Sequence, residues 1–110
     1  MEKNEIEKIA RTESLFREVN ERIAESAERF EATRTNFVCE CADPRCTDRV
    51  EASLTQYERV RENGNAFLLT PGHEDERVEA VVRSCGELAV VEKQHPLVRR
   101  LVLELDPRAA

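Results

Sequence analysis

Three of the four cysteines of this 110-residue chain fall within eight consecutive positions, at Cys39, Cys41 and Cys46. Thiols this close in sequence are typical of a metal site, because in a reducing compartment they bind soft ions rather than forming disulfides. An ion that ties separate segments together also replaces part of the hydrophobic core of a small domain. We call residues 39–46 the cysteine knuckle, and its spacing predicts a fold built around a bound metal.

The fourth ligand has more than one candidate in the sequence. His73 follows Pro71 and Gly72, and a glycine at this position allows the positive φ that would turn the imidazole toward the knuckle. Cys85 would complete an equally sound site of four thiolates, and His95 is a weaker competitor. We favour a structural zinc, which prefers tetrahedral sulfur and nitrogen donors. The predicted ligands are Cys39, Cys41, Cys46 and His73.

Composition limits both the core and the class of partner. Charged residues make up 36% of the chain and aromatic residues only 5%, so the buried surface must come mainly from Val, Leu, Ile and the metal. A net charge of −6 disfavours nucleic acid as a partner. No segment has the apolar length of a signal sequence or a membrane span, so we expect a cytoplasmic protein without membrane association.

Residues 5–33 contain no Gly or Pro and are rich in Glu, Arg and Ala, which predicts one long helix. This helix has a narrow apolar stripe that either lies across the domain's own sheet or pairs with a second helix as a dimer seam. At about 1.5 Å per residue the helix reaches roughly 43 Å, so we expect part of it to protrude. Asn20 falls beside the stripe, where it is exposed or fixes the register of a dimer. The stripe consists of Ile6, Ile9, Phe16, Val19, Ile23, Ala27 and Phe30.

The remaining residues form short apolar runs separated by turn residues, which predicts strands and one short helix. We expect strands over 36–39, 50–53 and 66–70. Thr55 and Glu58 have the spacing of a capping box, so the short helix should begin there, end near Asn63 and Gly64, and turn Tyr57 and Val60 inward.

The last third of the chain is ambiguous. Residues 78–93 match helical spacing and strand propensity alike, and we favour a hairpin that turns at 85–87. Residues 94–110 are expected to form an edge strand or a loosely held tail. The predicted fold class is α+β, with an N-terminal helical arm over 1–34 followed by a small zinc-stapled antiparallel β domain with one short helix over 35–110.

Several blocks of the chain together resemble an uncharacterised family of small actinobacterial proteins that has no established activity. The most specific block is the Cys-Glu-Cys-x4-Cys run with the later Gly-His turn, and the resemblance implies the same three cysteines and the same histidine as ligands. Cys85 departs from the family pattern, and the resemblance leaves function open. The blocks are 16–23, 37–43, Cys46, 57–58, 60–61, Phe67, 71–74, 90–93 and 106–108.

The residue pattern gives no sign of catalysis. Three thiolates weaken the Lewis acidity of a zinc ion, and a closed shell of four ligands leaves no open position for substrate. Glu74 directly follows His73, which does not match the His-x-Glu signature of zinc deaminases. We therefore expect a protein that is not an enzyme.

We expect instead an interaction or regulatory module whose helical arm mediates dimerisation or docks a protein partner. Two alternatives stay open at this point. The first is a nucleic-acid or transcription-complex binder that uses the cysteine knuckle. The second is a thiol–zinc redox switch that releases the metal when the thiolates are oxidised.

Overall fold

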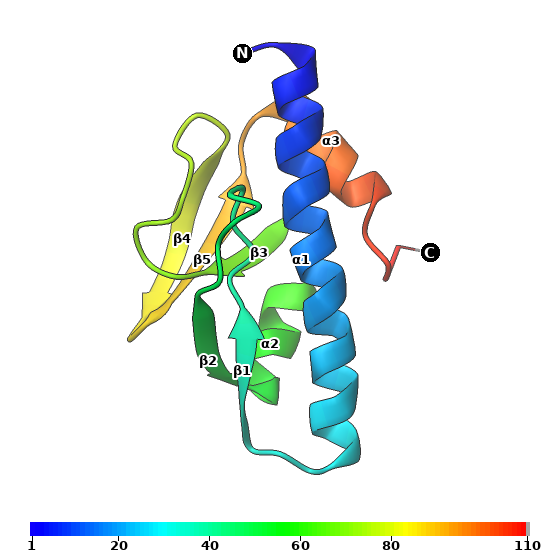
Figure 1. Ribbon diagram of the computed structural model, residues 1–110, viewed down its shortest axis with the longest axis vertical. Helices are drawn as coiled ribbons and strands as arrows, with labels where there is room; N and C mark the ends of the chain where they lie inside the picture. Colours follow the sequence, from blue (N-terminus) through cyan, green and yellow to red (C-terminus); the bar gives the residue numbers. More distant parts are fainter. Residues whose placement is uncertain (110) are drawn as a thin grey trace.

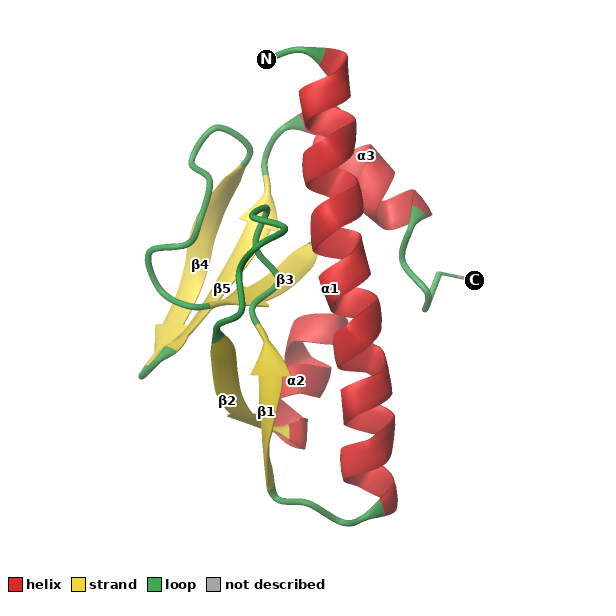
Figure 2. Ribbon diagram, viewed as in Figure 1, coloured by secondary structure: helices red, strands yellow, loops and turns green. Residues whose placement is uncertain are grey.

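The computed structural model describes residues 1–109 and has a mixed α+β fold, as predicted (Figure 1, Figure 2). A long N-terminal helix is followed by strands and short helices. In chain order the elements are α1 (Lys3–Arg29), β1 (Arg34–Val38), β2 (Arg49–Ser53), α2 (Leu54–Arg61), β3 (Ala66–Leu69), β4 (Glu79–Cys85), β5 (Leu88–Lys93) and α3 (Pro96–Glu104).

Two antiparallel sheets lie beside α1. Strands β1 and β2 form a two-stranded sheet, and β5 is the central strand of a three-stranded sheet in the order β3-β5-β4. Helix α1 runs the length of the molecule, with α3 packed on its N-terminal half and β1 alongside its C-terminal half (Figure 1). The core between these elements includes the stacked rings of Phe37 and Tyr57, whose centroids are 4.6 Å apart. The two sheets therefore share one core that α1 closes.

The apolar stripe of α1 is only partly buried. Ile6 and Ile9 belong to the core, whereas Val19 and Phe30 are 41% and 74% exposed. The cause is geometric, because an apolar repeat of seven residues drifts by about 20° per repeat on a helix of 3.6 residues per turn. The helix thus accounts for most of the 43 Å long axis of the molecule and packs along the sheets instead of protruding, while Val19 and Phe30 face solvent and Ala27 of the same stripe stays buried.

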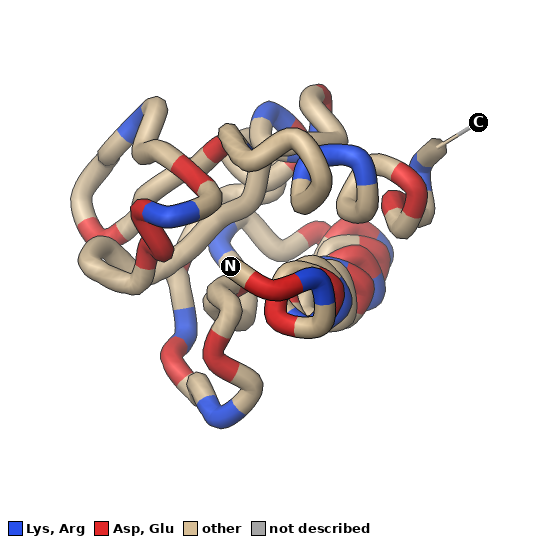
Figure 3. Tube along the Cα trace, turned by 90° about the horizontal axis from the view of Figure 1, so that it is seen from above, with Lys and Arg blue, Asp and Glu red and all other residues tan. Residues whose placement is uncertain are grey.

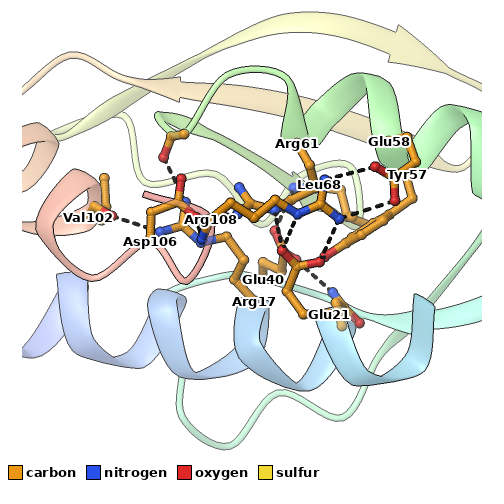
Figure 4. A network of polar contacts seen from close by, with 12 residues as sticks. Arg17, Glu21, Glu40, Tyr57, Glu58, Arg61, Leu68, Val102, Asp106 and Arg108 are labelled. Atoms are coloured by element: carbon orange, nitrogen blue, oxygen red, sulfur yellow. Dashed lines mark hydrogen bonds and ion pairs between the residues drawn. The ribbon is translucent and has the colours of Figure 1, made fainter. Parts of the chain in front are cut away.

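Polar residues occupy much of the buried face of α1. Glu13, Arg17 and Asn20 are fully buried, so the expectation of an exposed Asn20 was wrong. The Arg17 guanidinium donates to the carbonyl oxygens of Val102 (Figure 4) and Gly64, both at 2.7 Å, and it also lies over the Phe67 ring. Arg17 thus gives hydrogen-bond partners to the carbonyl of Gly64, between α2 and β3, and to the carbonyl of Val102, in the last turn of α3. These bonds explain why a charged residue lies in the core.

Arginines also join the C-terminal segment to the helices. Arg61 pairs with Glu21 of α1 and with Asp106, and Arg108 pairs with Glu21 and with Glu58 of α2 (Figure 4). Residues 106–108 are therefore held against α1 and α2 rather than forming a loose tail.

In the second half of the chain, the structure differs from the sequence prediction in two helices and confirms the predicted hairpin. Helix α2 starts earlier than expected, because Ser53 and Gln56 form the capping box. Residues 96–104 form a helix, not a strand, with His95 as N-cap and Pro96 in the first turn. Residues 79–93 form the favoured hairpin, and Gly86 has the positive φ of 60° that its turn requires.

Candidate metal centre

The structure brings Cys39, Cys41, Cys46 and His73 together. Their donor atoms all lie within 4.8 Å of one another, although the cysteines and the histidine come from two separate segments. His73 Nδ1 is 3.5 Å from the Cys39 sulfur and 3.6 Å from the Cys46 sulfur. Each cysteine is a free thiol. The four residues predicted from the sequence are thus placed so that they can hold one metal ion.

The knuckle is the connection between β1 and β2, and its backbone explains how the thiols converge. The Cys39 N–H donates to the Asp48 carbonyl at 3.1 Å, which extends the pairing of the two strands by one step. The Cys46 N–H donates to the Asp43 carbonyl at 3.0 Å, and the Asp43 carboxylate accepts from the Arg45 N–H at 2.9 Å. This tight turn returns the chain so that Cys46 faces Cys39.

The histidine arrives on the turn that follows β3. Gly72 has a φ of 93°, a conformation open to glycine but strained for other residues, and the His73 N–H donates to the Thr70 carbonyl at 3.1 Å. The turn is fixed beside the knuckle because the Thr70 N–H donates to the Cys39 sulfur at 3.3 Å. The predicted role of this glycine is confirmed.

A carboxylate orients the imidazole. His73 Nε2 is 3.3 Å from the Asp48 carboxylate, so Nε2 carries the proton and Nδ1 directs its lone pair at the sulfurs. The imidazole is 34% exposed, so the site has one face toward solvent. This arrangement assigns Nδ1 as the donor nitrogen of the site.

Glu40, between two of the thiols, is fully buried and anchors the knuckle to its surroundings. Its carboxylate accepts from the Asn20 side chain at 2.7 Å and from the Leu68 N–H at 3.1 Å, and its own N–H donates to the Leu68 carbonyl at 2.9 Å. Burial raises the pKa of Glu40 to about 7, against the opposing effect of these hydrogen bonds. The knuckle is therefore held to β3 and, through Asn20, to α1.

Hydrogen bonds within the cluster shift the thiol pKa values in opposite directions. The pKa of Cys39 is lowered, first because the Cys41 thiol donates to it and then because the Thr70 N–H does, whereas burial opposes this shift. The pKa of Cys41 is raised because it is the donor to Cys39, and burial raises the pKa of Cys46. Since a metal binds thiolates, it would displace these thiol protons. Three sulfur donors and one neutral imidazole are a donor set that zinc prefers.

The competing ligands lie elsewhere. Cys85 is an exposed residue at the end of β4, where it pairs with Leu88 of the hairpin. The His95 imidazole accepts from the Leu97 N–H at 3.2 Å as the N-cap of α3. Neither belongs to the metal-ligand cluster found among residues 1–109.

The supporting residues were not predicted from the sequence. Asp48 and Thr70 contact the ligands, and Asn20 contacts their neighbours Val38 and Glu40, yet each belongs to a residue type that is common on surfaces and in turns. Of these three residues, only Asp48 could have been suspected from the sequence. It lies two residues after the ligand Cys46, and carboxylates are frequent hydrogen-bond partners of metal-ligating histidines.

Comparison with known proteins finds no family model that matches the chain and no significant match among curated proteins or solved structures. Within residues 1–109, no helix combines the length and apolar character needed to cross a membrane.

Proposed function

We propose that the protein is a non-enzymatic, zinc-binding interaction module. The observation that carries this proposal is the convergence of three thiols and one imidazole, with donor atoms within 4.8 Å, from two separate segments of the chain. A zinc ion held there supplies folding free energy by joining the β1–β2 connection to the turn after β3. Four protein donors complete a tetrahedral shell, which supports a structural rather than a catalytic role.

The exposed part of the α1 stripe is the proposed contact surface. Val19 and Phe30 of the stripe are 41% and 74% exposed, Leu15 at its edge is 62% exposed, and Phe16 and Ile23 are partly buried beside them. Exposed apolar side chains gathered on one helix are typical of an association surface. Lys and Arg alternate with Asp and Glu along the trace (Figure 3), which supports a protein rather than a nucleic acid as the partner.

Two variants, Cys85→Ala and His73→Ala, test the metal role through their zinc content and their thermal unfolding. We expect one zinc per chain in the purified protein and in Cys85→Ala, and loss of zinc in His73→Ala. Chelation should lower the melting temperature of the intact protein and of Cys85→Ala, because the ion stabilises only the folded state. Zinc retention by His73→Ala together with zinc loss by Cys85→Ala would contradict the ligand set. A melting transition that chelation leaves unchanged would contradict the structural role.

A thiol redox switch is a second candidate, favoured by the accessibility of the site. The Cys46 thiol is only partly buried and the imidazole beside it is 34% exposed, so an oxidant can reach the sulfurs. Stoichiometric hydrogen peroxide should then release zinc from the intact protein, as measured with a chromogenic chelator. Retention of zinc until the protein unfolds would exclude this candidate.

A further inference from the structure

A groove separates α2 from the β4–β5 hairpin, away from the metal centre. The hollow with the more apolar lining, which we call the main hollow, has a volume of about 230 Å³, and it continues into a second, larger hollow of about 360 Å³ that shares Arg59, Val60, Arg83 and Val90. Helix α2 packs on β3, so it covers that side of the three-stranded sheet and leaves the β4 side open. We call this feature the α2–hairpin groove.

The floor of the groove is apolar. Val60 of α2 and Leu88 and Val90 of β5 line the main hollow and are 2%, 7% and 4% exposed. Val82 at the edge of the second hollow is 46% exposed. An apolar floor with a polar rim is the usual construction of a small-molecule site.

A β-bulge places a charge over this floor. The pairing of β4 with β5 runs from Val81 opposite Val91 directly to Arg83 opposite Val90, so Val82 is an extra residue. Residues directly opposite each other in an antiparallel pair share a face of the sheet. Without the extra residue Val82 would stand opposite Val90. The bulge thus directs Arg83 to the face of the apolar floor, an effect that bulges often have near binding sites.

Arg59 supplies a second cation from the other wall. Both arginines are exposed and line both hollows, and in the part of the chain that the structure describes neither forms an ion pair. Glu62 and Glu92 line the second hollow, but no carboxylate is among the residues that line the main hollow, so the two cations on its walls repel each other. An anion between them removes that repulsion and accepts hydrogen bonds from guanidinium groups, whose planar shape suits a carboxylate.

We propose that the α2–hairpin groove binds a small amphipathic carboxylate, with its apolar chain on Val60, Leu88 and Val90 and its carboxylate between Arg59 and Arg83. The main hollow is smaller than the roughly 300–1,000 Å³ of sites for drug-sized molecules, so the proposed ligand has a short apolar chain. This inference goes beyond the proposed function, because the groove shares no residue with the metal centre.

An NMR titration of the intact zinc-loaded protein with sodium octanoate tests the proposal. We expect saturable shifts of the amides of Val60, Leu88 and Val90. In the double variant Arg59→Gln with Arg83→Gln the affinity should fall at least about tenfold, the effect of losing a hydrogen bond between charged groups. Octan-1-ol, which has the same chain without the charge, should bind the intact protein more weakly by a similar factor. Both arginines are solvent-exposed, so the variant should keep the amide spectrum of the folded protein.

A matched control removes one exposed arginine outside the groove. Arg22→Gln on α1 removes one exposed positive charge, as each substitution of the double variant does, and we expect it to leave octanoate binding unchanged. The absence of a saturable shift up to about 10 mM octanoate would overturn the proposal. So would an equal loss in Arg22→Gln, shifts confined to another surface, or equal affinity for octan-1-ol.

Discussion

Asn20 joins the long helix by hydrogen bonds to the segment that carries the metal ligands. Its side chain both donates to the Val38 carbonyl at 2.9 Å and accepts from the Val38 N–H at 2.8 Å, and it donates to Glu40 at 2.7 Å. An amide side chain can satisfy a main-chain N–H and C=O at once because it carries both a donor and an acceptor. Residue 20 therefore acts as one rung of β-sheet pairing beside β1.

Asn20→Ala should destabilise the protein. The substitution leaves buried polar groups of Val38 and Glu40 without partners, at a cost of about 1–3 kcal/mol for each unsatisfied group. The free energy of unfolding, measured with urea, should fall by that order. Glu18→Ala on the exposed face of the same helix is the matched control and should change it little. Equal effects of the two substitutions would contradict the bridging role of Asn20.

Asp48→Asn should weaken metal binding without unfolding the protein. Asp48 contacts the imidazole at 3.3 Å, and its carboxylate holds His73 in the tautomer whose Nδ1 faces the sulfurs. Loss of such a partner lowers metal affinity by roughly 10–100-fold. Competition with a zinc chelator of known affinity measures the change. Glu76→Gln, which removes an exposed carboxylate near the site, is the control, and an equal loss in that variant would show that overall charge alone is responsible.

At the level of elements, local signals in the sequence were enough for some segments and not for others. The knuckle, the turn at Gly72 and the hairpin at Gly86 were predicted because thiol spacing and glycine conformations are local properties. Helix α3 was missed because its apolar residues also fit a strand, and its start depends on a histidine cap and Pro96. The start of α2 was misplaced because two capping patterns, Ser53 with Gln56 and Thr55 with Glu58, overlap within residues 53–58.

The buried charges of α1 could not be predicted at all, since they depend on distant partners. The Glu13 carboxylate forms an ion pair with the Lys93 ammonium of β5 at 2.7 Å, and Lys93 also forms an ion pair with Glu79 of β4. All three side chains are at most 1% exposed. A prediction from amphipathic spacing alone puts charged residues on the solvent-facing side of the helix, because a buried charge is expected only where an ion-pair partner is known.

This triad makes stability depend on pH in a defined direction. Burial raises the pKa of Glu13 from 4.5 to about 8, opposed by Lys93 and reinforced by Glu79. The unfolded chain thus loses this proton near pH 4.5 and the folded protein only near pH 8. The contribution of Glu13 to stability is present in full below about pH 4.5 and is lost as the pH rises through about 8.

Glu13→Gln should flatten the decline in stability between pH 5 and pH 9, because glutamine fills the same space and has no proton to lose. Urea unfolding at both pH values gives the slope for the variant and for the wild type. Two other charged residues lie near the triad. Arg17 lies over the Phe67 ring, as Lys93 does, and the Asp75 N–H donates to the Glu79 carboxylate. They are present in both proteins. Identical slopes in the two proteins would refute the assignment of the proton to Glu13.

Across the whole molecule, one long helix serves two surfaces. One face of α1 closes the core and carries Asn20 to the metal centre, while the exposed stripe with Val19 and Phe30 faces solvent. The drift of the seven-residue repeat around the helix connects these two faces, because Ile9 and Phe30 belong to the same repeat but end at 6% and 74% exposure. The same helix can therefore stabilise the fold and present an association surface.

The double variant Val19→Asp with Phe30→Asp should abolish self-association or partner binding and keep the fold. Both side chains are exposed, so aspartate at these positions costs little stability but places charges on an apolar contact surface, which opposes association. Light scattering should give a mass above that of one chain for the intact protein, and the mass of one chain for the variant at equal zinc content. Arg11→Asp with Arg29→Asp, exposed on the charged side of the same helix, is the control for added negative charge and should keep the mass of the intact protein. If the intact protein has the mass of one chain, pull-down with the two variants decides the docking role, and equal partner recovery by both would show that the stripe is not a contact surface.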